Sequence, residues 1–325
     1  MMSGTLRWSL VCLGVVYMLG GIGSGGRMVQ ARPAFQGSFE EKKGAFVAQE
    51  GEKVLMQYKY KDVPFKPYVQ QLFTPGGVPV LFDAPPDHPH HHALMFALGA
   101  DGVNFWEETE KGGKQLTRSI AAHYPCLLDS MKTFRVTSDL DWVASDGQPP
   151  VLKEKRSVEV ASWAEQKATL LNWRSVCEAP EPGKVVKLSG SHYFGLGMRF
   201  LPSMDKTGTF LNSSGQPGEI VRSDEHNVAA DWCAYQVTSE GKPVTVAVFA
   251  SPKNFPAPAV WFTMKEAFAY LSATLNLYKT PMELKPNEKL DLQYGVVLWD
   301  GTVSSEQIGQ AYQAWLGILK KGAKE

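Results

Sequence analysis

The sequence predicts an all-β fold, a large sandwich or barrel followed by one C-terminal helix. Two observations favour this class. Short runs rich in β-branched and aromatic residues alternate with turns rich in Gly and Pro along most of the 325 residues. No helical segments are interleaved between these runs, as a doubly wound α/β fold would require.

Six runs are predicted to be strands. Residues 133–137 and 157–163 alternate apolar and polar side chains, as half-buried strands do, whereas 244–249 is almost continuously β-branched or aromatic. The full set is 52–58, 133–137, 157–163, 169–176, 244–249 and 289–298. Turns are predicted where Gly and Pro gather, at 146–150, 180–183 and 213–218.

Residues 304–321 are predicted to form the C-terminal helix. Ser304 and Ser305 suit its first turn as capping residues, and the basic Lys320 and Lys321 suit its last turn. Apolar side chains recur at helical spacing, so this face is expected to pack on the sandwich; they are Ile308, Tyr312, Trp315, Leu316 and Leu319.

Composition and charge narrow the function classes. Apolar residues make up 44% of the chain, enough for a sizeable core. Lys and Arg together number 33, as do Asp and Glu, and no basic stripe is visible, which argues against a nucleic-acid partner. Continuous strand signals without a repeat or linker predict a single β-domain, 45–325, after a mobile segment, 32–44.

Residues 1–31 have the pattern of a secretory signal peptide. Arg7 precedes an apolar run over 9–23, and small residues then allow cleavage near Ala31. The mature chain is therefore expected in the periplasm or outside the cell, with an uncleaved anchor as the alternative. No later segment has about 18 uncharged apolar residues in a row, so no membrane span is expected in the mature chain.

Three cysteines follow the predicted signal peptide, namely Cys126, Cys177 and Cys233. An odd number allows at most one disulfide, and their spacing excludes a Cys-x-x-Cys motif. Buried free thiols are an equally good interpretation.

Four of the seven histidines fall within residues 87–92, which read Asp-His-Pro-His-His-His. Pro89 favours an extended backbone, which would place His88, His90 and His92 on one face of the segment. Such a face suits zinc, iron or copper, or a histidine that transfers protons near neutral pH. No complete metal-ligand pattern accompanies the cluster, so acid/base chemistry is preferred; a purely structural loop is the other alternative.

A second candidate segment is the Gly-rich stretch 189–200. It places His192, Tyr193 and Arg199 within one strand or bulge, where glycines let a ligand come close. An arginine beside aromatic rings suits a carboxylate or sugar hydroxyls. Tryptophans beside polar residues suit either sugar stacking or core packing, and they are Trp106, Trp232 and Trp261.

Several segments resemble the PmoA-like family of exported bacterial proteins, over about residues 45–315. The most specific is Asp-His-Pro-His-His at 87–91; the others are 73–80, 105–108, 192–199, 252–261 and 292–301. The resemblance implies a β-sandwich like that of galactose mutarotase, with His and carboxylates acting on sugars from a concave face. The chain departs from the family where His92 replaces an Arg and Phe194 a Gly. Methane monooxygenase activity is not expected, because the membrane enzyme needs several spanning helices.

These observations predict an exported protein whose partner is a small molecule, a sugar, bound in a concave cleft. It would be a non-catalytic binding protein or an epimerase, lyase or hydrolase. The predicted catalytic residues are His90, His91, His192 and Arg199. The predicted substrate-binding residues are Asp87, His88, Trp106, Glu107, Tyr193, Asn254 and Trp261. The alternative is a metal-dependent oxidase or oxygenase with the metal on His88, His90 and His92. The cofactor and the oligomeric state are left open.

Overall fold

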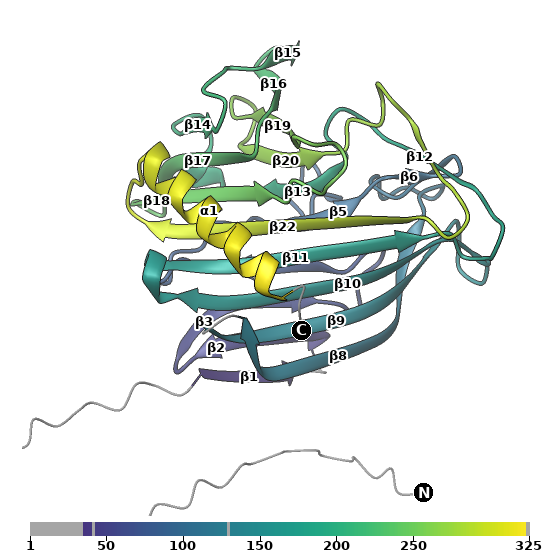
Figure 1. The fold of residues 1–325 in the computed structure, drawn as a ribbon, viewed down its shortest axis with the longest axis horizontal. Helices are drawn as coiled ribbons and strands as arrows, with labels where there is room; N and C mark the ends of the chain where they lie inside the picture. Colours follow the sequence, from purple (N-terminus) through teal and green to yellow (C-terminus); the bar gives the residue numbers. More distant parts are fainter. Residues whose placement is uncertain (1–34, 41–42, 129–130, 323–325) are drawn as a thin grey trace, which may run out of the picture. The chain divides into compact units, whose positions relative to one another are not determined.

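Two large antiparallel sheets and one small sheet make up the fold (Figure 1). The computed structural model describes residues 35–40, 43–128 and 131–322. Residues Ala34–Glu325 form one compact unit. The predicted all-β class with a C-terminal helix is confirmed. The predicted signal peptide, 1–31, lies outside the described residues, so export stays a prediction.

The ten-stranded sheet carries the candidate site. Its strands are β1 (Phe35–Glu40), β2 (Ala45–Glu50), β3 (Lys53–Lys59), β4 (Tyr68–Leu72), β5 (Leu94–Ala97), β13 (Gly195–Arg199), β15 (Glu219–Arg222), β16 (Glu225–Ala229), β19 (Val260–Met264) and β20 (Tyr270–Thr274). They run in the order β1-β2-β3-β4-β5-β13-β20-β19-β16-β15. The five strands β1 to β5, consecutive in the chain, therefore precede β13, which comes from much later in the chain.

The eight-stranded sheet contains the longest strands. They are β8 (Lys114–Leu128), β9 (Met131–Val143), β10 (Pro150–Trp163), β11 (Ala168–Glu178), β14 (Thr209–Asn212), β17 (Trp232–Ser239), β18 (Lys242–Ala250) and β22 (Lys289–Asp300). Their order is β14-β17-β18-β22-β11-β10-β9-β8. The small sheet has the order β21-β12-β6-β7, made of β6 (Gly99–Ala100), β7 (Val103–Asn104), β12 (Val186–Ser189) and β21 (Met282–Leu284). Two 3-10 turns, η2 (Ala164–Gln166) and η3 (Pro202–Met204), and the helix α1 (Ser305–Gly322) complete the fold.

All six predicted strands are confirmed, within β3, β9, β10, β11, β18 and β22. Within the segment predicted to be mobile, 32–44, residues Phe35–Glu40 form β1, which pairs in antiparallel register with β2 from Phe35 opposite Glu50 to Glu40 opposite Ala45. This pairing adds an edge strand to the ten-stranded sheet, which the sequence of the segment does not indicate. The mobility of the segment stays a prediction.

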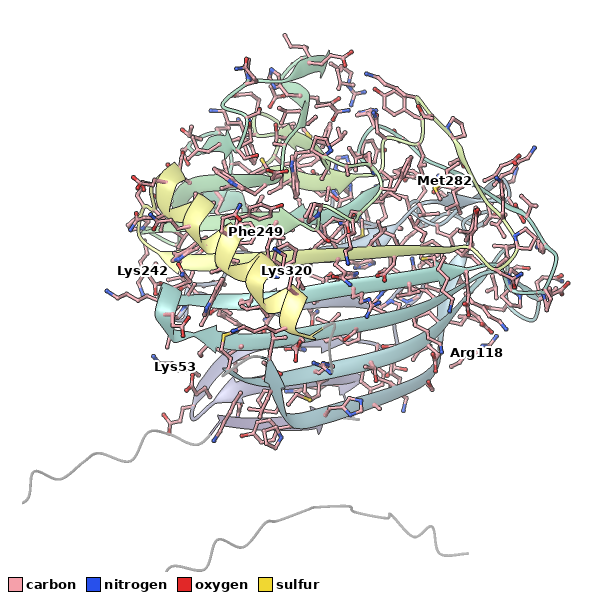
Figure 2. The ribbon with its side chains drawn as sticks, viewed as in Figure 1. Lys53, Arg118, Lys242, Phe249, Met282 and Lys320 are labelled. Atoms are coloured by element: carbon pink, nitrogen blue, oxygen red, sulfur yellow. The ribbon has the colours of Figure 1, made fainter. Side chains whose placement is uncertain are left out.

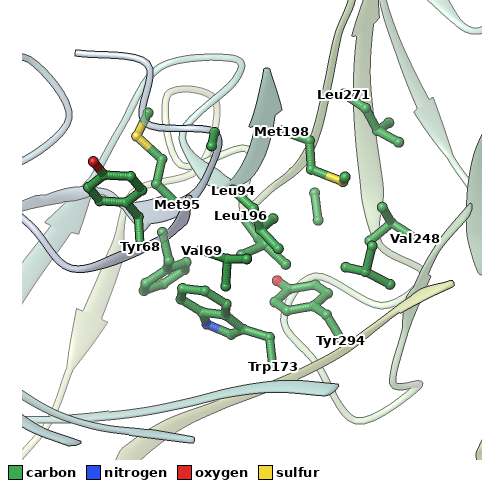
Figure 3. Close-up of a cluster of buried hydrophobic side chains, with 14 of the residues drawn as sticks. Tyr68, Val69, Leu94, Met95, Trp173, Leu196, Met198, Val248, Leu271 and Tyr294 are labelled. Atoms are coloured by element: carbon green, nitrogen blue, oxygen red, sulfur yellow. The ribbon is translucent and has the colours of Figure 1, made fainter. Parts of the chain in front are cut away.

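The main core lies between the two large sheets. Figure 3 shows Leu94 and Leu196 of the ten-stranded sheet facing Trp173 and Tyr294 of the eight-stranded sheet. Each of these four side chains is almost completely buried. Neighbouring residues of a strand point to opposite faces of its sheet. The residues next to these four along their strands therefore point to the outer faces of the sandwich.

One ion pair is enclosed in this core. Arg156 and Glu154 of β10 are both fully buried, and the Nη2 of Arg156 lies 2.8 Å from Oε2 of Glu154. Arg156 also donates to the Pro67 carbonyl oxygen at 2.9 Å and to Oε1 of Gln115 at 2.8 Å. Pro67 directly precedes β4, so this guanidinium joins the two large sheets.

Helix α1 packs on the outer face of the eight-stranded sheet (Figure 1). Ser304 and Gln307 cap its first turn reciprocally: the Gln307 amide donates to Oγ of Ser304, and the Ser304 amide to Oε1 of Gln307. Phe249, labelled in Figure 2, contacts both Tyr312 and Trp315. The predicted packing of the aromatic face is thus confirmed.

Cys126, Cys177 and Cys233 are free thiols. Cys177 pairs with Leu290 near the start of β22, whereas Cys233 lies level with Val296 through its partner in β18. Six residues of β22 separate these levels, roughly 20 Å, so the two buried thiols cannot bond. In the described part of the chain, no helix has the length and apolar character needed to cross a bilayer.

Candidate functional site

Residues 83–92, here called the His loop, form the last part of the connection from β4 to β5 and lie over the outer face of the ten-stranded sheet. Its first and last residues, Asp83 and His92, form a β-bridge. Next to this bridge, the Ala84 amide donates to the His91 carbonyl oxygen at 3.0 Å. The loop is therefore closed by backbone hydrogen bonds at its base.

Two tight turns bend the His loop between these ends. The His88 amide donates to the Pro85 carbonyl oxygen at 3.0 Å, and the His91 amide donates to the His88 carbonyl oxygen at 2.9 Å. The extended backbone predicted for this segment is therefore wrong. The rings of His88 and His90 still lie 5.7 Å apart, but His92 points elsewhere, and the ring of His88 also stacks on His91 with centroids 4.8 Å apart.

His92 points inward, where two carboxylates hold it. Its Nδ1 lies 2.9 Å from Oδ1 of Asp83 and its Nε2 lies 2.9 Å from Oε1 of Glu108. Its ring stacks on Tyr68 at 4.5 Å. Burial alone would lower the pKa of His92, but the two hydrogen bonds raise it above its ordinary value. Both nitrogens are used, so His92 anchors the loop and has none left for a metal or substrate.

Lys66 completes this buried charge group. Its Nζ lies 2.7 Å from Oε1 of Glu108 and 3.0 Å from the Trp106 carbonyl oxygen. Burial opposes ionisation of Glu108, yet His92 and Lys66 together lower its pKa below the ordinary value. His92 and Lys66 thus face two carboxylates, Asp83 and Glu108, although burial lowers the pKa of Lys66, and the group fixes the loop to the segment that carries Trp106.

The anchoring role predicts a pH-dependent stability difference for His92→Gln. The folded pKa of His92 is raised, so its stabilisation is complete below about pH 6.5, the unfolded value, and is lost as pH rises through the folded pKa. The variant is expected to be less stable by about 1–3 kcal/mol near pH 6, because two charged hydrogen bonds are lost. Denaturant unfolding from about pH 6 to 10 measures the narrowing gap.

His123→Gln is the control for this titration, because His123 is exposed and contacts Thr137 on the other sheet. A His92→Gln difference that stays constant across the range would contradict a charged His92.

The remaining histidines of the loop form an aromatic cluster. His91 lies against Tyr270 at 5.0 Å, Phe268 at 5.6 Å and His90 at 4.5 Å between ring centroids. Burial, with the neighbouring His90 and His88, lowers the pKa of His91 to about 2. His91 is therefore a neutral ring in the wall of the site at ordinary pH.

His90 and Glu107 form an open pair. Nε2 of His90 lies 3.5 Å from Oε2 of Glu107, and their side chains are 18% and 35% exposed. Burial lowers the pKa of His90, although the charge of Glu107 opposes this. A neutral imidazole beside a carboxylate, both reachable from solvent, is an arrangement able to accept and return protons.

Arg199 ends β13 beneath the His loop. Its guanidinium lies 3.5 Å from the centroid of the Phe268 ring, and Nη2 is 3.6 Å from Oδ2 of Asp87. Its side chain is only 5% exposed. Asp87 also lies 2.9 Å from Nδ1 of His88. The structure thus brings the predicted residues Asp87, His88 and Arg199 together.

Glycine in β13 makes room for Trp106 and Tyr270. A Cβ at Gly197 would lie 1.9 Å from the Tyr270 hydroxyl and 2.9 Å from the Trp106 ring. Trp106 stacks on Phe194 with centroids 4.9 Å apart and meets Tyr193 edge-on at 5.3 Å. The glycine-rich segment therefore lets aromatic rings of the protein itself lie directly on the sheet, where its sequence predicts the close approach of a ligand.

His192 belongs to a neighbouring group. Its Nε2 lies 3.3 Å from Oε2 of Glu225, and its ring contacts Tyr193 and Phe262. Burial lowers the pKa of His192 against the charge of Glu225. Tyr193 contacts both His192 and Trp106, so it joins this group to the His loop face.

Two predicted substrate-binding residues lie elsewhere, which corrects their assignment. Trp261 is fully buried and donates to the Ala230 carbonyl oxygen at 2.8 Å. It points into the core because its place in β19 puts it on the inner face. Asn254 exchanges two hydrogen bonds with the backbone of Gln293, so it holds a loop against β22.

Within the described residues, no three His, Cys, Asp or Glu side chains are grouped to hold a metal ion. In the set proposed from sequence, the rings of His88 and His90 lie 5.7 Å apart, but carboxylates occupy both nitrogens of His92, so His92 is not placed to complete it.

Several residues of the site carry no local signal in the sequence. Phe268, Tyr270 and Glu225 come from strands or loops far from the histidine segment, and their segments read as ordinary strands. Lys66 and Asp83 likewise lack a motif. Only the pairing of β13 with β5 and β20 brings Tyr270 beside Arg199 and the end of the His loop.

A hollow of about 420 Å³ lies on the outer face of the other large sheet. Ser119, Thr137, Lys155, Ser157 and Arg174 line it. Arg174 is already paired there with Asp291 at 2.7 Å.

Residues 45–313 match the protein-family model described as Family of unknown function (DUF6807). No protein of curated function matches the sequence. The fold is similar to the galactosidase domain of alpha-galactosidase-sucrose kinase, AgaSK, with a TM-score of 0.45 and 9% identity over 82% of this chain and 42% of that one. It is also similar to the Slr1438 protein from Synechocystis sp. PCC 6803, with a TM-score of 0.36 and 9% identity over 85% and 99% of the two chains. At these scores neither likeness indicates an activity.

Proposed function

Since this chain belongs to the family of unknown function DUF6807, we infer its activity from its own side chains. We propose that it binds a carbohydrate beside the His loop and transfers protons to and from this carbohydrate. The observation that carries this proposal is the His90–Glu107 pair, whose partly exposed side chains lie 3.5 Å apart beside a group of aromatic residues. The resemblance to PmoA-like proteins over the same stretch stays a prediction.

The chemistry of the pair supports proton transfer. His90 is held neutral by burial, and Glu107 faces it with a partly exposed carboxylate. One group can take a proton from the substrate while the other returns one, so the overall proton count is unchanged. Epimerisation and elimination on a sugar both need this pair of roles.

The aromatic residues support a sugar as the substrate. Tyr193 is only partly buried, and it packs edge-on against Trp106 next to the pair. The apolar faces of sugar rings stack on such side chains, and the polar groups of Asp87, His88 and Arg199 lie beside them for the hydroxyls.

Thermal denaturation with a panel of neutral and acidic sugars tests this proposal. A ligand at 100 times its Kd is expected to stabilise the protein by about 2.7 kcal/mol. The stabilisation is expected to disappear in His88→Ala/His90→Ala and to persist in His123→Ala, whose histidine lies on the opposite sheet. Stabilisation by no sugar, or equal stabilisation of the double variant, would contradict a carbohydrate site here.

A further inference from the structure

Four buried polar side chains over β13 have atoms without hydrogen-bond partners among the described residues. They are Nε and Nη1 of Arg199, the hydroxyl of Tyr270, Nε1 of Trp106 and Nδ1 of His91. Leaving one such group unsatisfied costs about 1–3 kcal/mol, so few are expected in any protein. Thirteen such atoms occur among the described residues, and the five on these four side chains lie close together, as the polar atoms of a ligand-binding site do.

These atoms belong to one small region, here called the donor recess. Arg199 and Tyr270 are cross-strand partners in β13 and β20, which lie side by side in Figure 1. The Tyr270 hydroxyl and the Trp106 ring both lie over Gly197, two residues before Arg199. His91 contacts Tyr270 and Trp106, with centroids 5.0 and 6.4 Å away.

The donor recess supplies hydrogens and positive charge. Guanidinium and indole nitrogens can only donate, and Tyr270 stays protonated because burial raises its pKa well above the ordinary value. Asp87 touches only Nη2 of Arg199, from a half-exposed position at the rim. The complementary ligand group therefore has several acceptor oxygens and a negative charge, which describes a carboxylate.

We propose that Arg199, Tyr270 and Trp106 bind the carboxylate of an acidic sugar, so that the substrate of this site is a uronate. The inference rests on the proposed carbohydrate function and specifies its substrate class. The recess adjoins the His90–Glu107 pair through Trp106, which directly precedes Glu107. A carboxylate neutralised by Arg199 makes the hydrogen on its neighbouring carbon more acidic.

That placement defines a balanced reaction. His90 and Glu107 lie 3.5 Å apart, so they act from one side of the sugar ring. One member of the pair breaks the C–H bond next to the carboxylate by taking its proton. A water molecule on the other side of the ring returns a proton to the same carbon, which re-forms a C–H bond and gives the epimer, and the protonated base then gives its proton to the resulting hydroxide. No oxidant, reductant or leaving group is needed.

Matched ligands test the substrate class. Galacturonate and galactose differ only at C6, as do glucuronate and glucose. Calorimetric titration of the full chain is expected to show at least about tenfold tighter binding of each uronate than of its neutral partner, from a charged hydrogen bond. Arg199→Met is expected to remove this preference, while Arg174→Met, at the hollow of the other sheet, is expected to keep it.

Tyr270→Phe separates ligand binding from folding. Because the hydroxyl has no partner, its removal is expected to leave the melting temperature unchanged or higher while weakening uronate binding about tenfold. A clear loss of stability without a loss of uronate binding would contradict the proposal that the Tyr270 hydroxyl binds the carboxylate.

The outcomes also distinguish this inference from the proposed function. Equal binding of neutral and acidic sugars would overturn the uronate while leaving a carbohydrate site intact. Binding of acetate as tight as that of a uronate would overturn the sugar part. Binding of none of these sugars would overturn both.

Discussion

Replacing Arg156 with methionine is expected to lower the free energy of unfolding by about 3–5 kcal/mol, because Glu154 would be left as an unpaired buried charge. Arg156 and Glu154 are both fully buried, and Trp142 donates to the same carboxylate at 2.9 Å. The guanidinium also satisfies the Pro67 carbonyl oxygen, whose strand belongs to the opposite sheet. Equilibrium unfolding in urea measures the loss.

The double variant Glu154→Leu/Arg156→Met shows whether the charge or the contact matters. Removing both partners is expected to recover most of the loss, since apolar replacements of buried ion pairs are often neutral or stabilising. A single variant that costs less than about 1 kcal/mol would mean that water reaches Glu154 in the core.

Replacing Glu107 with glutamine is expected to lower turnover of the sugar substrate by about 10²–10⁴-fold, the usual contribution of a general acid or base. Glutamine keeps the size of the side chain and its place beside His90, but it cannot exchange a proton. Binding of the sugar is expected to change far less than the rate, so Kd and kcat measured together give the test.

The pH profile of the wild type adds a second signature. Because burial lowers the pKa of His90, the acid limb of the rate is expected below about pH 6.5, the ordinary histidine value. His123→Ala should leave both the rate and this limb unchanged. A Glu107→Gln variant with wild-type turnover would exclude Glu107 from the chemistry.

The strands were predictable from sequence, whereas the side-chain directions in and around the His loop were not. Alternating runs such as 157–163 report which residues face the core, since the period of a strand is fixed. The segment 87–92 stands out by composition alone. Its conformation depends on two turns and on the buried partners of His92, and neither Asp83 nor Glu108 is marked by a motif.

The direction of the Trp261 side chain could not be predicted from the sequence either. A tryptophan among polar neighbours is compatible with stacking on a sugar or with the core. Only its register opposite Ala273 in β20 places it on the inner face. Tyr270, in contrast, is an outer-face residue of the same hairpin, and its unsatisfied hydroxyl becomes visible only when β13 is placed beside it.

The burial of two of the three free thiols bears on their reactivity. Cys177 and Cys233 are buried on different levels of one sheet, and burial raises the pKa of both. The thiolate is the form that reacts, so a thiol reagent is expected to modify these two cysteines only after the protein unfolds.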